Sequence, residues 1–245
     1  MCTVSWIHGA NGYELFCNRD ELLTRKPASP PRTLKVGGVQ IIAPRDGDFG
    51  GSWISANEFG LSLSLLNLYN SGVRQAGSFI SRGLLLMSLS ESRSQDQLIE
   101  RIAVKRMNQF QPFTLLAMEP GKAALIVTWD GNQCLTARCD EMNDPLTSSS
   151  FDSARVIEVR KENFRRLANS SGTIDSRILQ AFHSSHEPAA GAYSTCMHRE
   201  DAATVSLSHI KVDPDSIEFQ YFPCSPCRKE ALGISAEIQT LLRRK

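Results

Sequence analysis

The chain has 245 residues, of which 22% are charged, and a formal net charge of +1 at pH 7. Its 27 basic and 26 acidic residues are mixed along the chain, so no basic patch marks a nucleic-acid partner. Apolar runs such as residues 84–87 are far too short to cross a membrane, and the N-terminus lacks the features of a secretion signal. We therefore expect a cytoplasmic protein with neither a nucleic-acid partner nor stable membrane insertion.

The length of the chain is compatible with one large core. We find no internal repeat, no low-complexity tract and no segment with the composition of a linker. The sequence therefore predicts a single domain over residues 1–245.

The chain opens with a hairpin pattern. Residues 2–8 are rich in β-branched and aromatic side chains, which predicts a strand. Residues 9–12, Gly-Ala-Asn-Gly, predict a turn, and residues 13–19 predict the returning strand.

Two registers of this hairpin are possible. If residues 9–12 all belong to the loop, Cys2 lies opposite Arg19; if only residues 11–12 turn, Cys2 lies opposite Glu21. In both registers the segment 18–21 (Asn-Arg-Asp-Glu) reaches the Cys2 end of the hairpin.

The rest of the chain alternates between strand and helix patterns. Residues with strand character are 39–43, 52–56, 61–65, 113–118, 123–129, 133–137, 203–212 and 217–222. Segments with helical periodicity are 79–89, 95–107, 155–168, 174–183 and 230–242. Two polar, proline-containing segments, 26–32 and 140–153, predict loops, the first of them near the Cys2 end of the hairpin.

Strands occur at both ends of the chain, and helical pairs lie between them. This order favours antiparallel sheets covered by helices over the βαβ alternation of a doubly wound fold. The predicted class is therefore α+β.

Cys2 is the leading candidate for chemistry. Removal of the initiator methionine would leave one residue with both a thiol and an α-amino group, and an amine with a pKa near ~8 can accept the thiol proton. His8 is excluded as the base, because six residues of extended chain place it roughly 20 Å from Cys2.

The segment 18–21 supplies the groups that such a nucleophile needs. Arg19 offers a guanidinium to hold a thiolate, Asp20 and Glu21 offer carboxylates to orient the amine, and Asn18 offers an amide. The alternative is a charged strand end of the kind common at sheet edges.

The seven cysteines are an odd number in a chain of this size, which indicates mostly reduced thiols. Cys224 and Cys227 have the spacing of a redox or metal motif, but no second Cys/His pair lies at the distance typical of a zinc ribbon. We therefore expect two thiols in a turn after a strand, with a redox or ligand role as the alternative.

Four motifs in the first part of the chain resemble one family. They are Phe-Cys-Asn-Arg-Asp-Glu at 16–21, Pro-Pro at 30–31, Ala-Pro-Arg-Asp at 43–46 and Gly-Gly-Ser-Trp at 50–53. Together they resemble the NRDE family, also called the transport and Golgi organisation protein 2 family, over residues 2 to about 70. The resemblance implies a role in intracellular haem trafficking.

The chain is also distantly similar to the choloylglycine hydrolases, which are N-terminal-nucleophile enzymes with a four-layer αββα sandwich. The start Met-Cys-Thr, the segments 57–61 and 66–68, and the segment 193–197 carry this similarity. It implies the αββα fold and assigns to Asn67 the role of an oxyanion-hole amide.

The catalytic positions of those hydrolases are matched incompletely. Without gaps, their arginine falls on Asn18 and their aspartate on Glu21, whereas a one-residue bulge aligns Arg19 and Asp20. Their second active-site asparagine falls near Ser148, and their late arginine has no counterpart. A missing polarising group can cost a few kcal/mol of transition-state stabilisation.

The first functional hypothesis is haem handling without a catalytic metal, with haem donor and acceptor proteins as partners. Such a carrier needs an apolar cleft, a base for the propionates and a weak axial ligand. Candidates for these roles are His8, His198 and Cys2 as ligands and Arg19 or Arg45 as propionate partners.

The second hypothesis is an amidohydrolase or acyltransferase that acts on a small acyl-amide through Cys2, with Asn67 at the oxyanion. A third, an interaction protein that acts through its surface, has no charge run or amphipathic face to support it. The mismatches at the catalytic positions place haem handling slightly ahead of catalysis.

Either small amphipathic ligand, haem or an acyl compound, requires one shared cleft. We expect Cys2, Asn18 or Arg19, Asp20, Glu21 and Asn67 to border it. Trp53 is expected in its wall, with a place in the core as the alternative.

Overall fold

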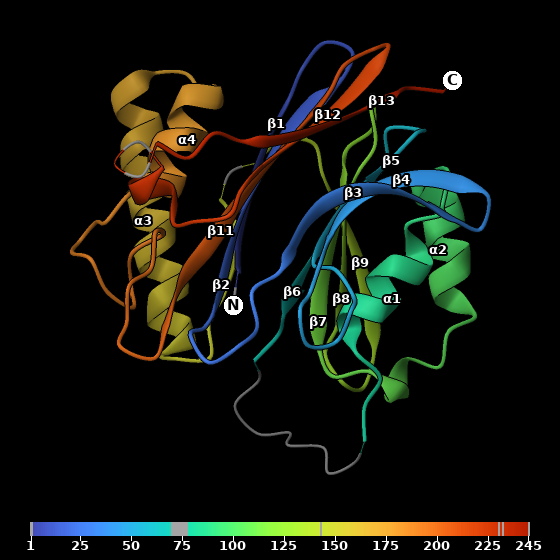
Figure 1. The fold of residues 1–245 in the computed structure, drawn as a ribbon, viewed down its shortest axis with the longest axis horizontal. Helices are drawn as coiled ribbons and strands as arrows, with labels where there is room; N and C mark the ends of the chain where they lie inside the picture. Colours follow the sequence, from blue (N-terminus) through green and yellow to red (C-terminus); the bar gives the residue numbers. More distant parts are fainter. Residues whose placement is uncertain (1, 70–77, 143, 230, 232, 245) are drawn as a thin grey trace.

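The computed structural model describes residues 2–69, 78–142, 144–229, 231 and 233–244. Two antiparallel sheets pack face to face, and helices cover their outer faces (Figure 1). This arrangement confirms the predicted four-layer αββα sandwich.

The first sheet has six strands in the order β10-β1-β2-β11-β12-β13. Their bounds are β1 Cys2–His8, β2 Tyr13–Leu22, β10 Leu146–Ser148, β11 Ala202–Val212, β12 Ser216–Phe222 and β13 Glu237–Leu242. Its outer face is covered by α3 (Ser153–Ser171) and α4 (Ser176–Ser184) (Figure 1).

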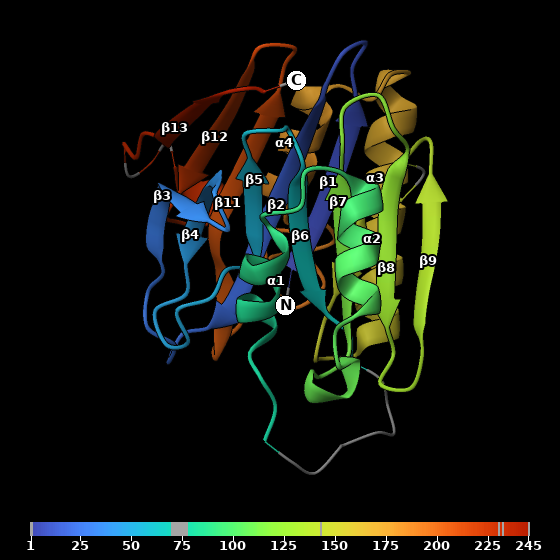
Figure 2. The same cartoon turned by 90° about the vertical axis from the view of Figure 1, so that its right-hand side faces the viewer.

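The second sheet has seven strands in sequential order from β3 to β9. Their bounds are β3 Ser29–Val36, β4 Val39–Arg45, β5 Ile54–Asn57, β6 Ser62–Asn67, β7 Phe113–Met118, β8 Ala124–Trp129 and β9 Cys134–Cys139. Figure 2 shows α1 (Arg82–Leu89) and α2 (Gln95–Ala103) lying across its outer face. Two short 3-10 turns, η1 (Met107–Gln109) and η2 (Pro226–Arg228), complete the elements.

The N-terminal hairpin adopts the first of the two predicted registers. Cys2 pairs with Arg19 and His8 pairs with Tyr13, so residues 9–12 form the whole loop. The turn needs glycine at position 12, because a Cβ there would lie 1.8 Å from the carbonyl oxygen of Val212 on β11.

Strand alternation divides β1 and β2 between two environments. Val4, Trp6 and Leu15 point between the sheets and join the core with side chains of the second sheet such as Ile54 and Leu66. Each fully buried side chain of this size contributes roughly 1.5–3 kcal/mol to the free energy of folding. The alternate side chains of β1 and β2 face the helices instead.

The second sheet has its own core beneath α1 and α2. Leu85, Leu86 and Leu89 of α1 and Leu98 of α2 are buried against β6, β7 and β8. The spacing of these leucines places them on one face of each helix, which is why the two helices pack flat on the sheet.

His183 shows how polar side chains are accommodated between α4 and the first sheet. Its Nε2 lies 2.8 Å from Ser5 Oγ, and its ring stacks on Phe16 with a centroid distance of 5.8 Å. Burial, with the nearby positive charge of Arg160, lowers the pKa of His183 to about 3. The folded protein therefore keeps this imidazole neutral throughout the physiological range.

We expect His183→Gln to flatten the acid side of the stability profile. In the unfolded chain His183 titrates near its ordinary pKa of 6.5, so the unfolded state binds the extra proton between pH 6.5 and about 3. The stabilisation is complete above pH 6.5 and falls by up to ~1.4 kcal/mol per pH unit below it. Urea unfolding at several pH values between 6.5 and 4 measures this slope, and equal slopes for both proteins would contradict it.

Three predictions of secondary structure were wrong. The predicted loop 26–32 gives way at Ser29 to β3, and the predicted loop 140–153 contains the short strand β10. The predicted helix 230–242 is replaced at Glu237 by β13, which pairs with β12 along its whole length. In each case pairing with a neighbouring strand supplies backbone hydrogen bonds that local propensity does not anticipate.

Among the residues that the structure describes, no helix is both long and apolar enough to cross a membrane.

Candidate functional site

A cleft of about 310 Å³ opens at the Cys2 end of the hairpin, between strand ends of the two sheets and the start of α1. Its polar wall is formed by Cys2, Arg19, Glu21, Arg25, Asp46, Ser52, Asn67, Ser81, Arg82 and Gln111. Its apolar wall is formed by Phe49, Trp53, Leu65, Phe79 and Ile80. The cleft therefore combines positive charge with a large apolar surface.

The Gly-Gly-Ser-Trp motif explains how α1 reaches this cleft. A Cβ at Gly51 would lie 2.4 Å from the carbonyl carbon of Gly83, so the backbones of these two residues approach more closely than side chains allow. The amide of Ser52 donates a hydrogen bond of 3.2 Å to the Gly83 carbonyl, which holds the first turn of α1 against the cleft.

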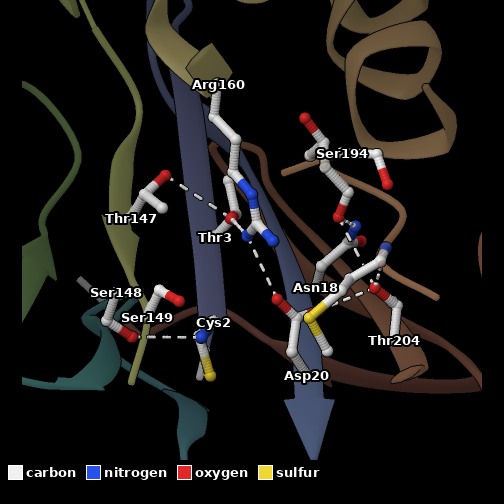
Figure 3. Close-up of polar contacts among 12 residues, drawn as sticks. Cys2, Thr3, Asn18, Asp20, Thr147, Ser148, Ser149, Arg160, Ser194 and Thr204 are labelled. Carbon is white, nitrogen blue, oxygen red and sulfur yellow. Dashed lines mark hydrogen bonds and ion pairs between the residues drawn. The ribbon is translucent and has the colours of Figure 1, made fainter. Parts of the chain in front are cut away.

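Cys2 points between the sheets at the inner end of the cleft and is only 7% exposed. Its main-chain nitrogen donates a hydrogen bond of 3.1 Å to Ser148 Oγ (Figure 3). Ser148 lies directly opposite Cys2 on β10, a strand that sequence patterns did not predict. The position onto which the second asparagine of the hydrolases falls is thus occupied by a hydroxyl that holds the Cys2 nitrogen.

Two neighbouring thiols face the same side of this sheet, and their ionisation differs. A hydrogen bond from the Cys17 thiol lowers the pKa of Cys2, and the positive charge of Arg19 contributes, although burial and Asp20 oppose this. The same hydrogen bond and burial raise the pKa of Cys17 well above its ordinary value. The shared hydrogen bond therefore favours ionisation of Cys2 over ionisation of Cys17.

Arg19 lies opposite Cys2 and lines the cleft, but carboxylates share its charge. Its Nη2 donates to Asp46 Oδ2 at 2.6 Å and to Glu21 Oε2 at 3.2 Å, and the guanidinium carbon sits 4.5 Å above the Trp53 ring. Trp53 therefore belongs to the cleft wall while remaining packed in the core. Glu21 lines the cleft and also lies 3.6 Å from Arg25.

Asp46 organises this end of the cleft, and sequence reasoning missed it together with Arg25 and Arg82. Its Oδ2 accepts a hydrogen bond from Arg19 Nη2, and both of its carboxylate oxygens accept from Arg25 Nη2, at 2.8 Å each. Burial raises the pKa of Asp46, but hydrogen bonds from the amides of residues 48 and 49 and the two arginines outweigh it, so its pKa is lowered overall. The Ala-Pro-Arg-Asp motif at 43–46 contains Asp46, but Arg45 was the residue predicted from it.

Arg45, the arginine that sequence analysis selected from that motif, lies outside the cleft lining. Its side chain is exposed, and its Nε donates to the Gly50 carbonyl at 3.0 Å. In its place the structure brings Arg82, the first residue of α1, into the cleft wall. Burial lowers the pKa of Arg82, and the Cys2 thiol is close enough to act on it in the opposite direction.

Asn18 and Asp20 do not border the cleft, contrary to expectation. Strand alternation turns both side chains to the opposite face of β2, toward α3 and α4. Asp20 is fully buried there and pairs with Arg160 Nη1 at 3.1 Å, while Thr204 Oγ1 donates to it at 2.6 Å (Figure 3). Asn18 Nδ2 donates to main-chain carbonyls of residues 183 and 195.

Arg160 is the residue that holds the Asp20 side chain on the helix-facing side of β2. Helical periodicity placed it in the predicted helix 155–168, where an arginine side chain is ordinarily exposed. Instead it is 1% exposed, and its Nη1 also donates to Thr3 Oγ1 at 2.5 Å, next to Cys2. Through Arg160, Asp20 therefore stabilises β1 and β2 on the face of the sheet opposite to Cys2.

Asn67 ends β6 and lines the cleft as expected. Its Nδ2 donates a hydrogen bond of 3.0 Å to Tyr69 Oη. An amide nitrogen carries two hydrogens, so Asn67 can serve Tyr69 and a ligand oxygen at the same time.

The two candidate histidine ligands lie away from the cleft. His8 is at the far end of β1, beside the hairpin turn, and burial lowers its pKa. His198 lies in the loop before β11 among other potential metal ligands, and burial lowers its pKa as well. Of the candidate axial ligands, only Cys2 is in the cleft.

Three solved structures share the fold. An N-acylethanolamine-hydrolyzing acid amidase ortholog from Caenorhabditis elegans gives a TM-score of 0.58 at 9% identity, with 100% of each chain covered. A variant of conjugated bile acid hydrolase from Clostridium perfringens gives 0.60 at 12% identity, covering 100% of this chain and 98% of the hydrolase. Penicillin V acylase from Agrobacterium tumefaciens gives 0.52 at 10% identity, covering 90% and 82%. At these identities the likeness establishes the N-terminal-nucleophile hydrolase fold alone.

The sequence comparisons are more selective. No curated protein matches the chain. The family model described as Transport and Golgi organisation 2 matches residues 1–221, which include the hairpin, the cleft and β11. The chain therefore belongs to the Transport and Golgi organisation 2 family.

Proposed function

We propose that the protein hydrolyses a small N-acyl amide, with Cys2 as the nucleophile. One observation carries this proposal: a thiol with a lowered pKa, whose own nitrogen is held by Ser148, faces the same cleft as the Asn67 amide. Nucleophile and base thus both belong to Cys2 on β1, the hydroxyl that holds the base comes from Ser148 on β10, and the oxyanion donor comes from Asn67 on β6.

The reaction requires that Met1 be removed, so that the Cys2 nitrogen is an amine. The amine then accepts the thiol proton, and the thiolate attacks the substrate carbonyl to form a C–S bond. Asn67 Nδ2 donates to the developing oxyanion. The C–N bond breaks as the protonated amine transfers its proton to the leaving nitrogen, and water then hydrolyses the thioester to release the carboxylic acid.

The cleft favours an acyl group that carries a negative charge. Trp53, Phe49 and Leu65 offer an apolar surface for a chain or ring, and Arg19 and Arg82 offer positive charge beside Cys2. A volume of about 310 Å³ lies at the lower end of the range for small-molecule sites, roughly 300–1,000 Å³. A short or folded acyl chain therefore fits this cleft better than a long extended one.

An assay of Met1-trimmed protein on a panel of N-acyl amides tests this function. The panel should vary acyl length and include anionic and neutral acyl groups, with intact mass confirming that Met1 is absent. We expect release of the free acid to depend on trimming, because a retained methionine converts the base into an amide. Equal turnover by trimmed and untrimmed protein would contradict the mechanism.

Haem handling is the second candidate, because the same cleft pairs arginines with an aromatic wall and a thiol. Arg19 or Arg82 is suited to bind propionates, Trp53 to contact the macrocycle and Cys2 to act as a single axial ligand. His8 and His198 have no part in this proposal, since both lie outside the cleft. We therefore rank haem handling second, which reverses the order that the sequence favoured.

Titration with haem separates the two candidates. A carrier should bind haem reversibly, and Cys2→Ser should shift the Soret band by removing the thiolate ligand. Haem binding without any amide hydrolysis would make transport the function of the cleft, with haem donor and acceptor proteins as partners. Hydrolysis without haem binding would leave the amidase alone.

A further inference from the structure

Four potential metal ligands meet on the far side of the first sheet, away from the cleft. His186, Cys196 and His198 come from the loop between α4 and β11, and Cys227 comes from η2. The loop and η2 lie beside the same end of α4 (Figure 1). Residues separated by some thirty positions in sequence are thus neighbours in the fold.

The distances among these ligands match those around a bound ion. His198 Nε2 lies 3.5 Å from Cys196 Sγ and 3.4 Å from Cys227 Sγ. Zinc bonds of ~2.3 Å to sulfur and ~2.0 Å to nitrogen, at tetrahedral angles, place sulfur and nitrogen about 3.5 Å apart. All four ligand atoms lie within 4.8 Å of one another, so a small inward movement of the most distant atoms would close a tetrahedron.

The four ligands range from a fully buried cysteine to an exposed histidine, as is suitable for a structural metal site. Cys196 is fully buried, Cys227 and His198 are partly buried, and His186 closes the cluster from the solvent side. The His186 and His198 rings meet edge to face, with centroids 5.1 Å apart, so neither ring stacks on the other and blocks the centre. An ion can enter from the His186 side.

We propose that His186, Cys196, His198 and Cys227 bind one Zn²⁺ ion in a tetrahedral site. Two thiolates and two imidazoles are the ligand set that selects zinc among the common divalent ions. Binding releases one proton from each thiol to solvent, and the two thiolate charges then balance the charge of the ion. Because protein atoms fill all four positions, the ion has a structural role and leaves no position open for substrate.

The site joins the loop between α4 and β11 to η2. The loop that carries Cys196 and His198 also contacts two strands of the first sheet, since Thr195 O accepts from Asn18 on β2 and the Met197 amide donates to Thr204 Oγ1 on β11. An ion that ties this loop to η2 therefore stabilises the strand on which Arg19 lies. The spacing of the ligands differs from a zinc ribbon, which is why the sequence did not indicate it.

Titration of the reduced, chelator-treated full-length protein with Co²⁺, followed by displacement with Zn²⁺, tests the proposal. We expect one equivalent of Co²⁺ to bind, with the strong visible bands of tetrahedral coordination and the near-ultraviolet absorption of cobalt–thiolate bonds. Zn²⁺ should then remove both signals at one equivalent. Absence of the thiolate band, or the weak spectrum of six-coordinate cobalt, would overturn the site.

Two neighbouring cysteines provide a matched pair of variants. Cys227→Ser should abolish the thiolate band or at least halve it, whereas Cys224→Ser, three residues earlier on the same turn, should leave the spectrum unchanged. Equal loss in both variants would overturn the assignment. Peptide mapping of protein purified without reductant is a further test. A Cys196–Cys227 disulfide in protein without bound zinc would overturn the metal site and indicate a redox pair instead.

His186→Ala keeps the test decisive if the cysteine variants fold poorly. His186 is exposed, so its removal leaves the packing of the loop intact. We expect the affinity for Zn²⁺, measured by competition with a chromophoric chelator, to fall at least tenfold, and circular dichroism to be unchanged. Unchanged affinity would show that His186 is no ligand and would overturn the four-ligand site.

Discussion

Cys2→Ser is expected to lower kcat/KM for amide hydrolysis by on the order of 10⁴-fold, since loss of a nucleophile in a concerted site typically removes most of the rate enhancement. The serine hydroxyl can accept the same hydrogen bond from Cys17, but it does not ionise near neutral pH. It therefore loses the thiolate that the hydrogen bond from Cys17 and the charge of Arg19 favour at this position. Rates of free-acid release by the two Met1-trimmed proteins measure the effect.

Cys134→Ser is the matched control for this prediction. Cys134 lies exposed on β9, the outer strand of the second sheet, and does not line the cleft. We expect its rate to equal that of the unmodified protein. If Cys2→Ser retained activity within tenfold of the unmodified protein, Cys2 would not be the nucleophile.

The second large effect concerns the buried ion pair behind the cleft. Asp20→Asn should lower the free energy of unfolding by about 3–5 kcal/mol, because it leaves the Arg160 guanidinium charged and uncompensated between α3 and the sheet. The side chains of Asp20 and Arg160 are 0% and 1% exposed, so water cannot replace the lost partner. Urea unfolding followed by circular dichroism measures the change.

A surface ion pair on the same helix provides the comparison. Arg165 pairs with Asp144 at 2.7 Å, but its side chain is 49% exposed. Arg165→Ala should therefore change the free energy of unfolding by no more than ~1 kcal/mol. The double variant Asp20→Leu with Arg160→Met should recover much of the loss, since it removes both charges together. A cost for Asp20→Asn as small as that for Arg165→Ala would show that the buried pair does not anchor α3.

Arg19 and Asp20 show what strand alternation alone can predict about the site. These residues are adjacent in the segment 18–21, and strand alternation necessarily sends them to opposite faces of β2. Once the hairpin register places Arg19 opposite Cys2, Asp20 must face the helices. Treating the four residues as one cluster overlooked this period of two, which was available from the sequence alone.

The resemblance to the choloylglycine hydrolases implied the αββα sandwich with Cys2 at the start of a central strand. Local patterns in the sequence determined the hairpin, a turn within residues 9–12, the apolar faces of the strands and helices, and the α+β class. These features depend on alternation, helical periodicity and turn chemistry, all of which act over a few residues. The motifs shared with its family marked most of the cleft, including Arg19, Trp53 and Asn67.

Only the tertiary structure decided which distant groups meet Cys2 and which do not. Ser148 reaches its nitrogen through a strand with three residues, and Arg82 reaches the cleft because two glycines allow α1 to approach. Arg160 is buried and pairs with Asp20. Cys227 lies beside Cys196 in the ligand cluster, to which Cys224 does not belong. Such contacts depend on how whole sheets and helices pack, and no local periodicity records that packing.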